Sequence, residues 1–81
     1  MTRVAIRMPK VSYEADVASL SGWLKAVGDR VAVDEPIAEV ETEKTNLDLA
    51  APATGVLSEI IVGPHEDVAV DSVIGYVDVE D

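Results

Sequence analysis

The stretch that decides the fold is Glu41-Thr42-Glu43-Lys44-Thr45-Asn46, a short polar run between two apolar, alternating segments. Ile37-Ala38-Glu39-Val40 precedes it and Leu47-Asp48-Leu49-Ala50 follows it. Alternation with a period of two is typical of strands, and a few polar residues between two strands indicate a hairpin turn. Lys44 then stands at the tip, exposed and reachable from several directions. Such a lysine suits a residue that one enzyme modifies and others later visit. The alternative is an ordinary charged turn, because turns favour polar residues.

The size and composition of the chain predict one small β domain spanning residues 1–81. A chain of 81 residues buries only about 60% of the surface that its unfolded state exposes, which leaves a modest core. Aromatic residues are few: Trp23, Tyr13 and Tyr76. The other apolar side chains are mostly Val, Ala, Ile and Leu, a β-leaning set suited to a thin sandwich. We expect Trp23 to pack in or beside the core.

The formal net charge of −10, from 16 acidic and 6 basic residues, argues against nucleic acid and against an anionic membrane as partners. A basic or neutral protein partner is compatible with this charge, and so is a role in solubility alone.

With no cysteine and a single histidine, His65, the sequence excludes a zinc site and a thiol nucleophile. We expect His65 to be a loop residue without partners. The lack of cysteine favours an intracellular chain, and the sequence shows no signal peptide, presequence or membrane-spanning run.

The alternation of apolar residues predicts a succession of strands. The expected strands cover residues 4–8, 17–24, 31–33, 37–42, 46–51, 56–62, 68–70 and 73–79. The second is contested, because Leu20, Trp23 and Val27 also fall at helical spacing. Ser19 is a possible N-cap for a helix there, whereas Gly22 disfavours a helix by about 1 kcal/mol.

An internal repeat favours the strand in this contested segment. Residues 30–41 and 67–78 align without a gap, and six of the twelve pairs are identical: Val31/Val68, Ala32/Ala69, Val33/Val70, Asp34/Asp71, Ile37/Ile74 and Val40/Val77. Upstream, we align Gly22-Trp23-Leu24 with Gly55-Val56-Leu57, with four extra residues in the second copy. Since residues 56–62 are rich in Val and Ile, their counterpart is expected to be a strand too. Two similar halves of about four strands imply a sandwich with quasi-twofold symmetry.

The repeat also predicts where the termini lie. In the first copy the strand 37–42 runs into the Lys44 hairpin, whereas in the second the strand 73–79 runs into the end of the sequence. We therefore expect residues 79–81 to lie beside residues 1–4 as an antiparallel pair, far from Lys44. A module tethered at one end and carrying a reactive group at the other suits a swinging carrier.

Several motifs occur in an order that resembles one protein family. They are Met8-Pro9-Lys10, Trp23-Leu24, Val27-Gly28-Asp29, Ile37-Ala38-Glu39-Val40-Glu41-Thr42-Glu43-Lys44 and Pro52-Ala53-Thr54-Gly55, and together they cover nearly the whole chain. The sequence resembles the lipoyl domains of acyltransferase components of 2-oxo acid dehydrogenase complexes, within the biotinyl/lipoyl attachment family. The resemblance implies an all-β fold, a flattened barrel or sandwich of two four-stranded antiparallel sheets. It also implies that lipoate is attached through an amide to Lys44, with Glu43 and Thr45 as flanking recognition residues.

Two positions depart from the family pattern. Glu43 and Thr45 stand where most members have Asp and Ala, which keeps an acid before the lysine and a small residue after it. The Glu-Gly pair usual before the second strand is replaced by Val17-Ala18, in a loop region that also holds Tyr13 and Glu14 and helps partner enzymes to recognise the domain. The sequence therefore leaves open which 2-oxo acid complex is served. Biotin carriers have methionines beside their lysine, so Glu43 and Thr45 favour lipoate over biotin.

The resemblance implies a carrier that is not itself an enzyme, without catalytic residues or a metal. Lipoate would carry acyl groups and electrons among a thiamine-diphosphate-dependent 2-oxo acid decarboxylase, an acyltransferase catalytic domain and dihydrolipoamide dehydrogenase. A lipoate-attaching enzyme is the fourth implied partner. The isolated domain is expected to be a monomer in the bacterial cytoplasm or the mitochondrial matrix. Two alternatives stay open: another covalent carrier on the same fold, of the biotin or glycine-cleavage type, and an unmodified acidic β domain that binds a protein partner.

Overall fold

The computed structural model describes residues 2–11, 16–42 and 45–80. Every regular element within these ranges is a β-strand, as predicted. The strands are β1 (Thr2–Arg7), β2 (Val17–Trp23), β3 (Arg30–Val31), β4 (Pro36–Glu41), β5 (Asn46–Ala50), β6 (Gly55–Ile60), β7 (Val68–Ala69) and β8 (Val73–Val79). The contested second segment is a strand, which confirms the inference from the repeat. The part of the chain described holds no helix long and apolar enough to span a membrane.

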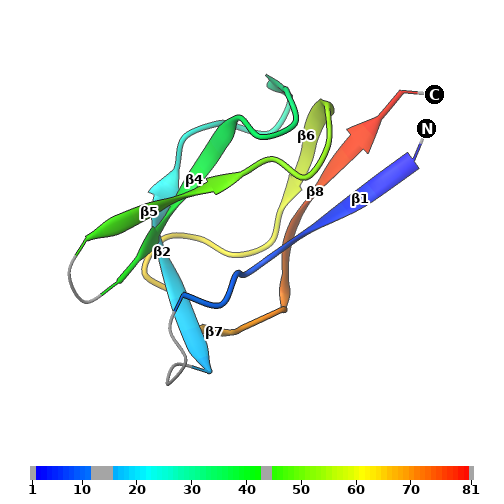
Figure 1. The fold of residues 1–81 in the computed structure, drawn as a ribbon. Coiled ribbons are helices and arrows are strands. Elements are labelled where there is room, and N and C mark those ends of the chain that lie inside the picture. The colour runs from blue at the N-terminus through cyan, green and yellow to red at the C-terminus, as the bar shows by residue number, and fades with distance from the viewer. Residues whose placement is uncertain (1, 12–15, 43–44, 81) are drawn as a thin grey trace.

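The strands form two four-stranded antiparallel sheets, which confirms the predicted architecture (Figure 1). The first sheet has the order β1-β8-β6-β3 and the second has the order β5-β4-β2-β7. Exchanging β1 with β5, β8 with β4, β6 with β2 and β3 with β7 converts one order into the other. The two halves are therefore related by the quasi-twofold symmetry that the repeat predicts.

The strand registers correct the upstream part of the repeat. Leu20 in β2 and Leu57 in β6 pair with equivalent valines of β4 and β8. Leu20 is therefore the counterpart of Leu57, and the spacing of 37 residues that relates residues 30–41 to 67–78 continues upstream without an insertion. The predicted equivalence of Gly22 and Gly55 is wrong, because at this spacing the counterpart of Gly55 is Ala18.

Local details recur at the same spacing. A register irregularity interrupts β2 at Ser21 and β6 at Ser58. Each of these serine hydroxyls donates a hydrogen bond to a carbonyl of the paired strand, at 3.3 Å and 3.2 Å. Asp34 and Asp71 both have positive φ, 70° and 72°, in the turns that lead into β4 and β8. Because a left-handed residue breaks the extended conformation, β3 and β7 end earlier than the predicted strands 31–33 and 68–70.

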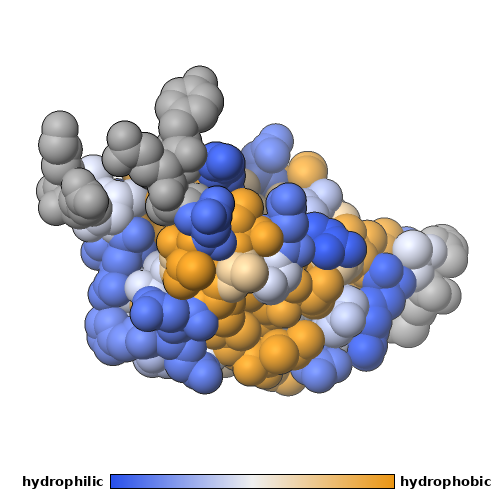
Figure 2. All heavy atoms as spheres, turned by 90° about the horizontal axis from the view of Figure 1, so that it is seen from below, coloured by the Kyte–Doolittle hydropathy of each residue, from blue (hydrophilic) through white to orange (hydrophobic). Residues whose placement is uncertain are grey.

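The core lies between the two sheets and consists largely of equivalent pairs. Leu20 and Leu57, Ile37 and Ile74, and Val40 and Val77 are each no more than 1% exposed. Some large apolar side chains stay exposed: Val17, Leu24, Val27, Val33, Leu47 and Ile61. Figure 2 shows apolar surface in the middle of one face and hydrophilic side chains toward its two ends.

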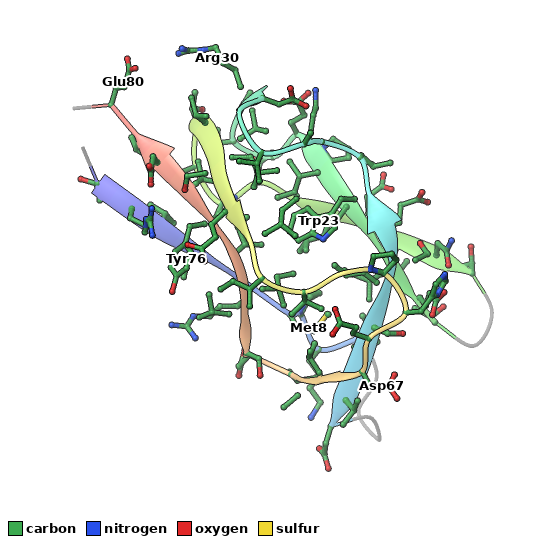
Figure 3. All side chains as sticks on the ribbon, turned by 180° about the vertical axis from the view of Figure 1, so that it is seen from behind. Met8, Trp23, Arg30, Asp67, Tyr76 and Glu80 are labelled. Carbon is green, nitrogen blue, oxygen red and sulfur yellow. The ribbon has the colours of Figure 1, made fainter. Side chains whose placement is uncertain are left out.

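Trp23 closes the side of the core between the sheets (Figure 3). Its ring is half-buried against the core cluster, and its Nε1–H donates a hydrogen bond to the carbonyl of Val62 at 2.8 Å. A partly buried indole needs such a partner for its single donor. The predicted packing role of Trp23 is confirmed.

β1 and β8 form an antiparallel pair, as the repeat predicts. Thr2 pairs with Val79 at the outer end of this pair. The guanidinium of Arg3 lies beside this pair, 3.2 Å from the Asp78 carboxylate and 4.9 Å from the centroid of the Tyr76 ring. The molecule measures 38 × 19 × 18 Å, with the ends of β1 and β8 together at one end and the β4–β5 hairpin pointing to the other (Figure 1).

Candidate functional site

The β4–β5 hairpin contains the stretch of sequence that carries Lys44. Its ladder ends with the pair Glu41 and Asn46. Beyond this pair, the N–H of Thr42 donates to the carbonyl of Thr45 at 3.1 Å, and the N–H of Thr45 donates to Oγ1 of Thr42 at 3.1 Å. The Thr42 hydroxyl also donates to the Thr45 carbonyl. The chain therefore reverses direction between Thr42 and Thr45, as predicted. Glu43 and Lys44, which lie between them in the sequence, are outside the described residues.

The two strands of the hairpin differ in how they are anchored. β4 is a central strand, and its Ile37, Ala38 and Val40 side chains are at most 1% exposed. β5 is an edge strand, and Thr45 and Asn46 at its start are exposed. The hairpin therefore combines a base held in the core with an end that another protein can approach.

Three polar side chains from different segments meet at the base of the hairpin. Oε2 of Glu41 accepts a hydrogen bond from Oγ of Ser19 at 2.9 Å, and Oε1 of Glu41 lies 2.9 Å from Nδ1 of His65. Ser19 belongs to β2, and His65 belongs to the segment between β6 and β7. The expectation that His65 has no partner is wrong. The N–H of His65 donates to the carbonyl of Leu20 at 2.7 Å, and this contact brings the β6–β7 segment beside the end of β4.

The other two lysines of the chain have different surroundings. Nζ of Lys25 lies 3.1 Å from Oε2 of Glu35, and only 30% of the Lys25 side chain is exposed. The pKa of Glu35 is lowered, first because its carboxylate accepts the N–H of Ala32 at 2.9 Å and second because Lys25 lies beside it. Lys10 is exposed in the segment that follows β1. Neither lysine stands between two paired strands, whereas Lys44 does in the sequence.

Of the four residues expected to guide partner recognition, the structure describes Val17 and Ala18. Val17 and Ala18 belong to β2, in agreement with the predicted strand 17–24, and they pair with Ala69 and Val68 of β7. Ala18 is 7% exposed and Val17 is 50% exposed, so Val17 alone of the two presents a side chain to partners. Tyr13 and Glu14 lie outside the described residues.

The fold and the hairpin together define a class of protein. Among the residues that the structure describes, no three His, Cys, Asp or Glu side chains are grouped to hold a metal ion. A small symmetric β sandwich with a lysine-bearing hairpin at one end is the architecture of a covalent carrier domain. The chain belongs to the biotin/lipoyl family, since the family model described as "Biotin-requiring enzyme" matches residues 4–77.

Relatives of known role are acyltransferase components. The dihydrolipoyllysine-residue acetyltransferase component of the pyruvate dehydrogenase complex of Corynebacterium glutamicum is 38% identical over 69 residues, which are 85% of this chain and 10% of the relative. The corresponding succinyltransferase component of the 2-oxoglutarate dehydrogenase complex of Cupriavidus necator is 36% identical over 80 residues, 99% of this chain and 19% of the relative. The chain therefore spans less than a fifth of the length of these curated relatives.

A solved structure agrees with these matches. The lipoyl domain of the 2-oxoglutarate dehydrogenase complex of Azotobacter vinelandii superposes with a TM-score of 0.72 and 25% identity, covering 95% of this chain and 100% of that domain. The predicted family and fold are thereby confirmed. The chain is a lipoyl domain of the kind found in acyltransferase components, and such a domain is a carrier that is not catalytic by itself.

Proposed function

We propose that this chain is a swinging-arm carrier with lipoate joined through an amide to Lys44. The observation that carries the proposal is the β4–β5 hairpin, closed between Thr42 and Thr45 on a strand buried in the core. Amide formation needs an amine that an attaching enzyme can reach, and Thr45 and Asn46 beside the lysine are exposed. Lys25, by contrast, is engaged with Glu35.

In this function the protein positions the lipoyl group, and the group itself carries out the chemistry. Lipoate, when bound, supplies a disulfide that accepts an acyl group and two electrons. The proposed attachment point directly follows the buried β4 strand in the sequence, and the β4–β5 hairpin points to one end of a molecule 38 Å long. Tethering such a module within a larger assembly raises the effective concentration of the arm at each active site. Attachment also removes the charge of Lys44, so the formal net charge of −10 becomes one unit more negative.

The proposed partners are a thiamine-diphosphate-dependent 2-oxo acid decarboxylase, an acyltransferase catalytic domain, dihydrolipoamide dehydrogenase and a lipoate-attaching enzyme. The named relatives support this set, because they are components of pyruvate and 2-oxoglutarate dehydrogenase complexes. An acidic carrier favours partners with basic surfaces around their active sites. We place the domain, as a monomer, in the bacterial cytoplasm or the mitochondrial matrix.

Biotin is the second candidate group, since the matching family is described by biotin-requiring enzymes. Two observations favour lipoate. Glu43 and Thr45 flank Lys44 where biotin carriers are expected to have methionines. The matching solved structure is a lipoyl domain.

The proposal is tested by presenting the purified chain in parallel to a lipoate-attaching and a biotin-attaching enzyme and measuring its intact mass. We expect a lipoyl addition and no biotinyl addition. The lipoylated chain should then gain an acyl group from a thiamine-diphosphate decarboxylase supplied with pyruvate or 2-oxoglutarate. The variant Lys44→Arg should fold normally and gain nothing in either step. A biotinyl adduct, or no adduct on the wild-type chain, contradicts the proposal.

A further inference from the structure

The side chain of Glu41 has a polar neighbour at each carboxylate oxygen. Ser19 Oγ donates to Oε2 at 2.9 Å, and Nδ1 of His65 lies 2.9 Å from Oε1. This order differs from that of a hydrolytic triad, because the serine donates to the carboxylate and not to the imidazole. The arrangement therefore fixes the direction of the imidazole rather than activating a nucleophile.

The backbone of His65 has a positive φ and the same hydrogen bond as the equivalent residue of the other half, so the two positions differ mainly in the side chain. His65 has φ 63°, and its counterpart at the spacing of 37 residues is Gly28, which has φ 99°. The two N–H groups donate to equivalent carbonyls, of Leu20 at 2.7 Å and of Leu57 at 2.8 Å. Glycine therefore satisfies this turn in the other half without the steric cost that a side chain has at positive φ.

Stability does not explain why a histidine stands there. The His65 side chain is 69% exposed and that of Glu41 is 37% exposed. Ion pairs and hydrogen bonds between exposed groups contribute little to folding, because water competes for both partners. A side chain that is exposed, held in one direction and placed at an unfavourable φ is better explained by an interaction outside the domain.

The 2.9 Å contact between Nδ1 and the Glu41 carboxylate favours one tautomer of the imidazole, because a carboxylate oxygen accepts and does not donate. When Nδ1 carries the proton and donates it to Oε1, the neutral ring has Nε2 as an acceptor. With Nδ1 directed at Glu41, Nε2 on the other side of the ring is left for a donor from solvent or from another protein. Glu41 itself is the last residue of β4 and pairs with Asn46, so this acceptor lies beside the base of the hairpin.

We propose that His65, positioned by Glu41, is a specificity-determining residue that accepts a hydrogen bond from a cationic side chain, Arg or Lys, of the lipoate-attaching enzyme. This inference rests on the proposed function. The attaching enzyme must bring its active site to the lysine itself, and it therefore approaches the base of the hairpin, where His65 contacts Glu41. A cationic donor also matches the formal net charge of −10.

The test compares the steady-state kinetics of lipoylation for the wild-type chain and four variants. His65→Gly introduces the residue that the other half has at the equivalent position, Gly28. We expect kcat/KM for the domain as substrate to fall roughly fivefold, mainly through a higher KM, as loss of one hydrogen bond predicts. His65→Gln keeps an acceptor and should recover part of the loss. Glu41→Gln should give an intermediate loss. Asp34→Gly is the matched control, since it also places glycine at a positive φ but at the opposite end of β4, and it should react like the wild type.

A second readout does not depend on activity. Nitrogen NMR of the histidine ring at about pH 8, where imidazoles are generally neutral, should show the proton on Nδ1 in the wild type and a mixture of tautomers in Glu41→Gln. An unchanged kcat/KM in His65→Gly overturns the inference and leaves the proposed function standing, because Lys44 is still modified. If the imidazole shows the same distribution of tautomers in the wild type and in Glu41→Gln, the positioning role of Glu41 is overturned. A wild-type chain that is never lipoylated overturns both the inference and the proposed function.

Discussion

Gly55 gives a sharp test of how closely β6 and β8, the two central strands of the first sheet, pack. A Cβ at this position in β6 would lie 2.1 Å from the carbonyl oxygen of Asp78 and 2.9 Å from its carbonyl carbon. Because these are backbone atoms of the paired strand β8, no side-chain rotation relieves the contact. The strand has to retreat by roughly 1 Å before ordinary contact distances return. We expect Gly55→Ala to lower the free energy of unfolding by about 2–3 kcal/mol, the upper part of the range for overpacking.

The assay is thermal unfolding followed by circular dichroism. In a domain of this size each kcal/mol changes Tm by about 4–8 °C, so Gly55→Ala should melt roughly 10–20 °C below the wild type. The matched control is Gly22→Ala in β2, where nothing lies within 4 Å of the new Cβ, and its Tm should be unchanged or slightly higher. A Gly55→Ala variant that melts within about 3 °C of the wild type would refute the reasoning.

Three further predictions concern the two halves, one carboxylate and the terminal strand. Leu20→Ala and Leu57→Ala remove equivalent side chains that are both 0% exposed, so each should cost about 2–5 kcal/mol in urea unfolding; a loss confined to one of them would show that the halves are not packed alike. The pKa of Glu35 is lowered in the folded state, so the stability that its charged form contributes is present above its ordinary value of 4.5 and is lost as the pH falls through the lower folded value. The Tm advantage of the wild type over Glu35→Gln should therefore shrink on acidification below 4.5, and an advantage that does not change with pH would contradict this. Amide exchange in β1 should be as slow as in β6, because β8 pairs with both strands, and fast exchange throughout β1 would contradict the pairing.

The hairpin and the symmetric arrangement of the two halves can be predicted from the sequence, the first from local alternation and the second from the internal repeat. Strand alternation on either side of residues 41–46 needs only neighbouring residues to be recognised. The repeat between residues 30–41 and 67–78 then predicts the symmetric halves and the pairing of β1 with β8, which the structure confirms.

The upstream alignment of the repeat fails for a physical reason. Gly22 and Gly55 are each followed two residues later by a leucine, and this likeness suggests equivalence. The hydrogen-bond register instead makes Leu20 the counterpart of Leu57, at positions where the sequence offers few other identities. Residue likeness is weaker evidence than register, since the register decides which side chains face the core.

Contacts between distant segments are what the sequence does not show. The contact of Glu41 with His65 depends on where the β6–β7 segment passes the end of β4. The sequence also does not show that a Cβ at Gly55 would meet the backbone of Asp78, because the equivalent position of the other half holds a buried alanine, Ala18. Both features depend on how segments distant in the sequence pack together, which only the assembled fold defines.

Peptide mapping of the lipoylated chain by tandem mass spectrometry identifies the lysine that carries the lipoyl group. The chain has three lysines, Lys10, Lys25 and Lys44, so the outcome is unambiguous. We expect every modified molecule to carry the lipoyl group on Lys44, and Lys44→Arg to be folded and unmodified. A lipoyl group on Lys10 or Lys25, or a modified Lys44→Arg chain, would contradict this expectation.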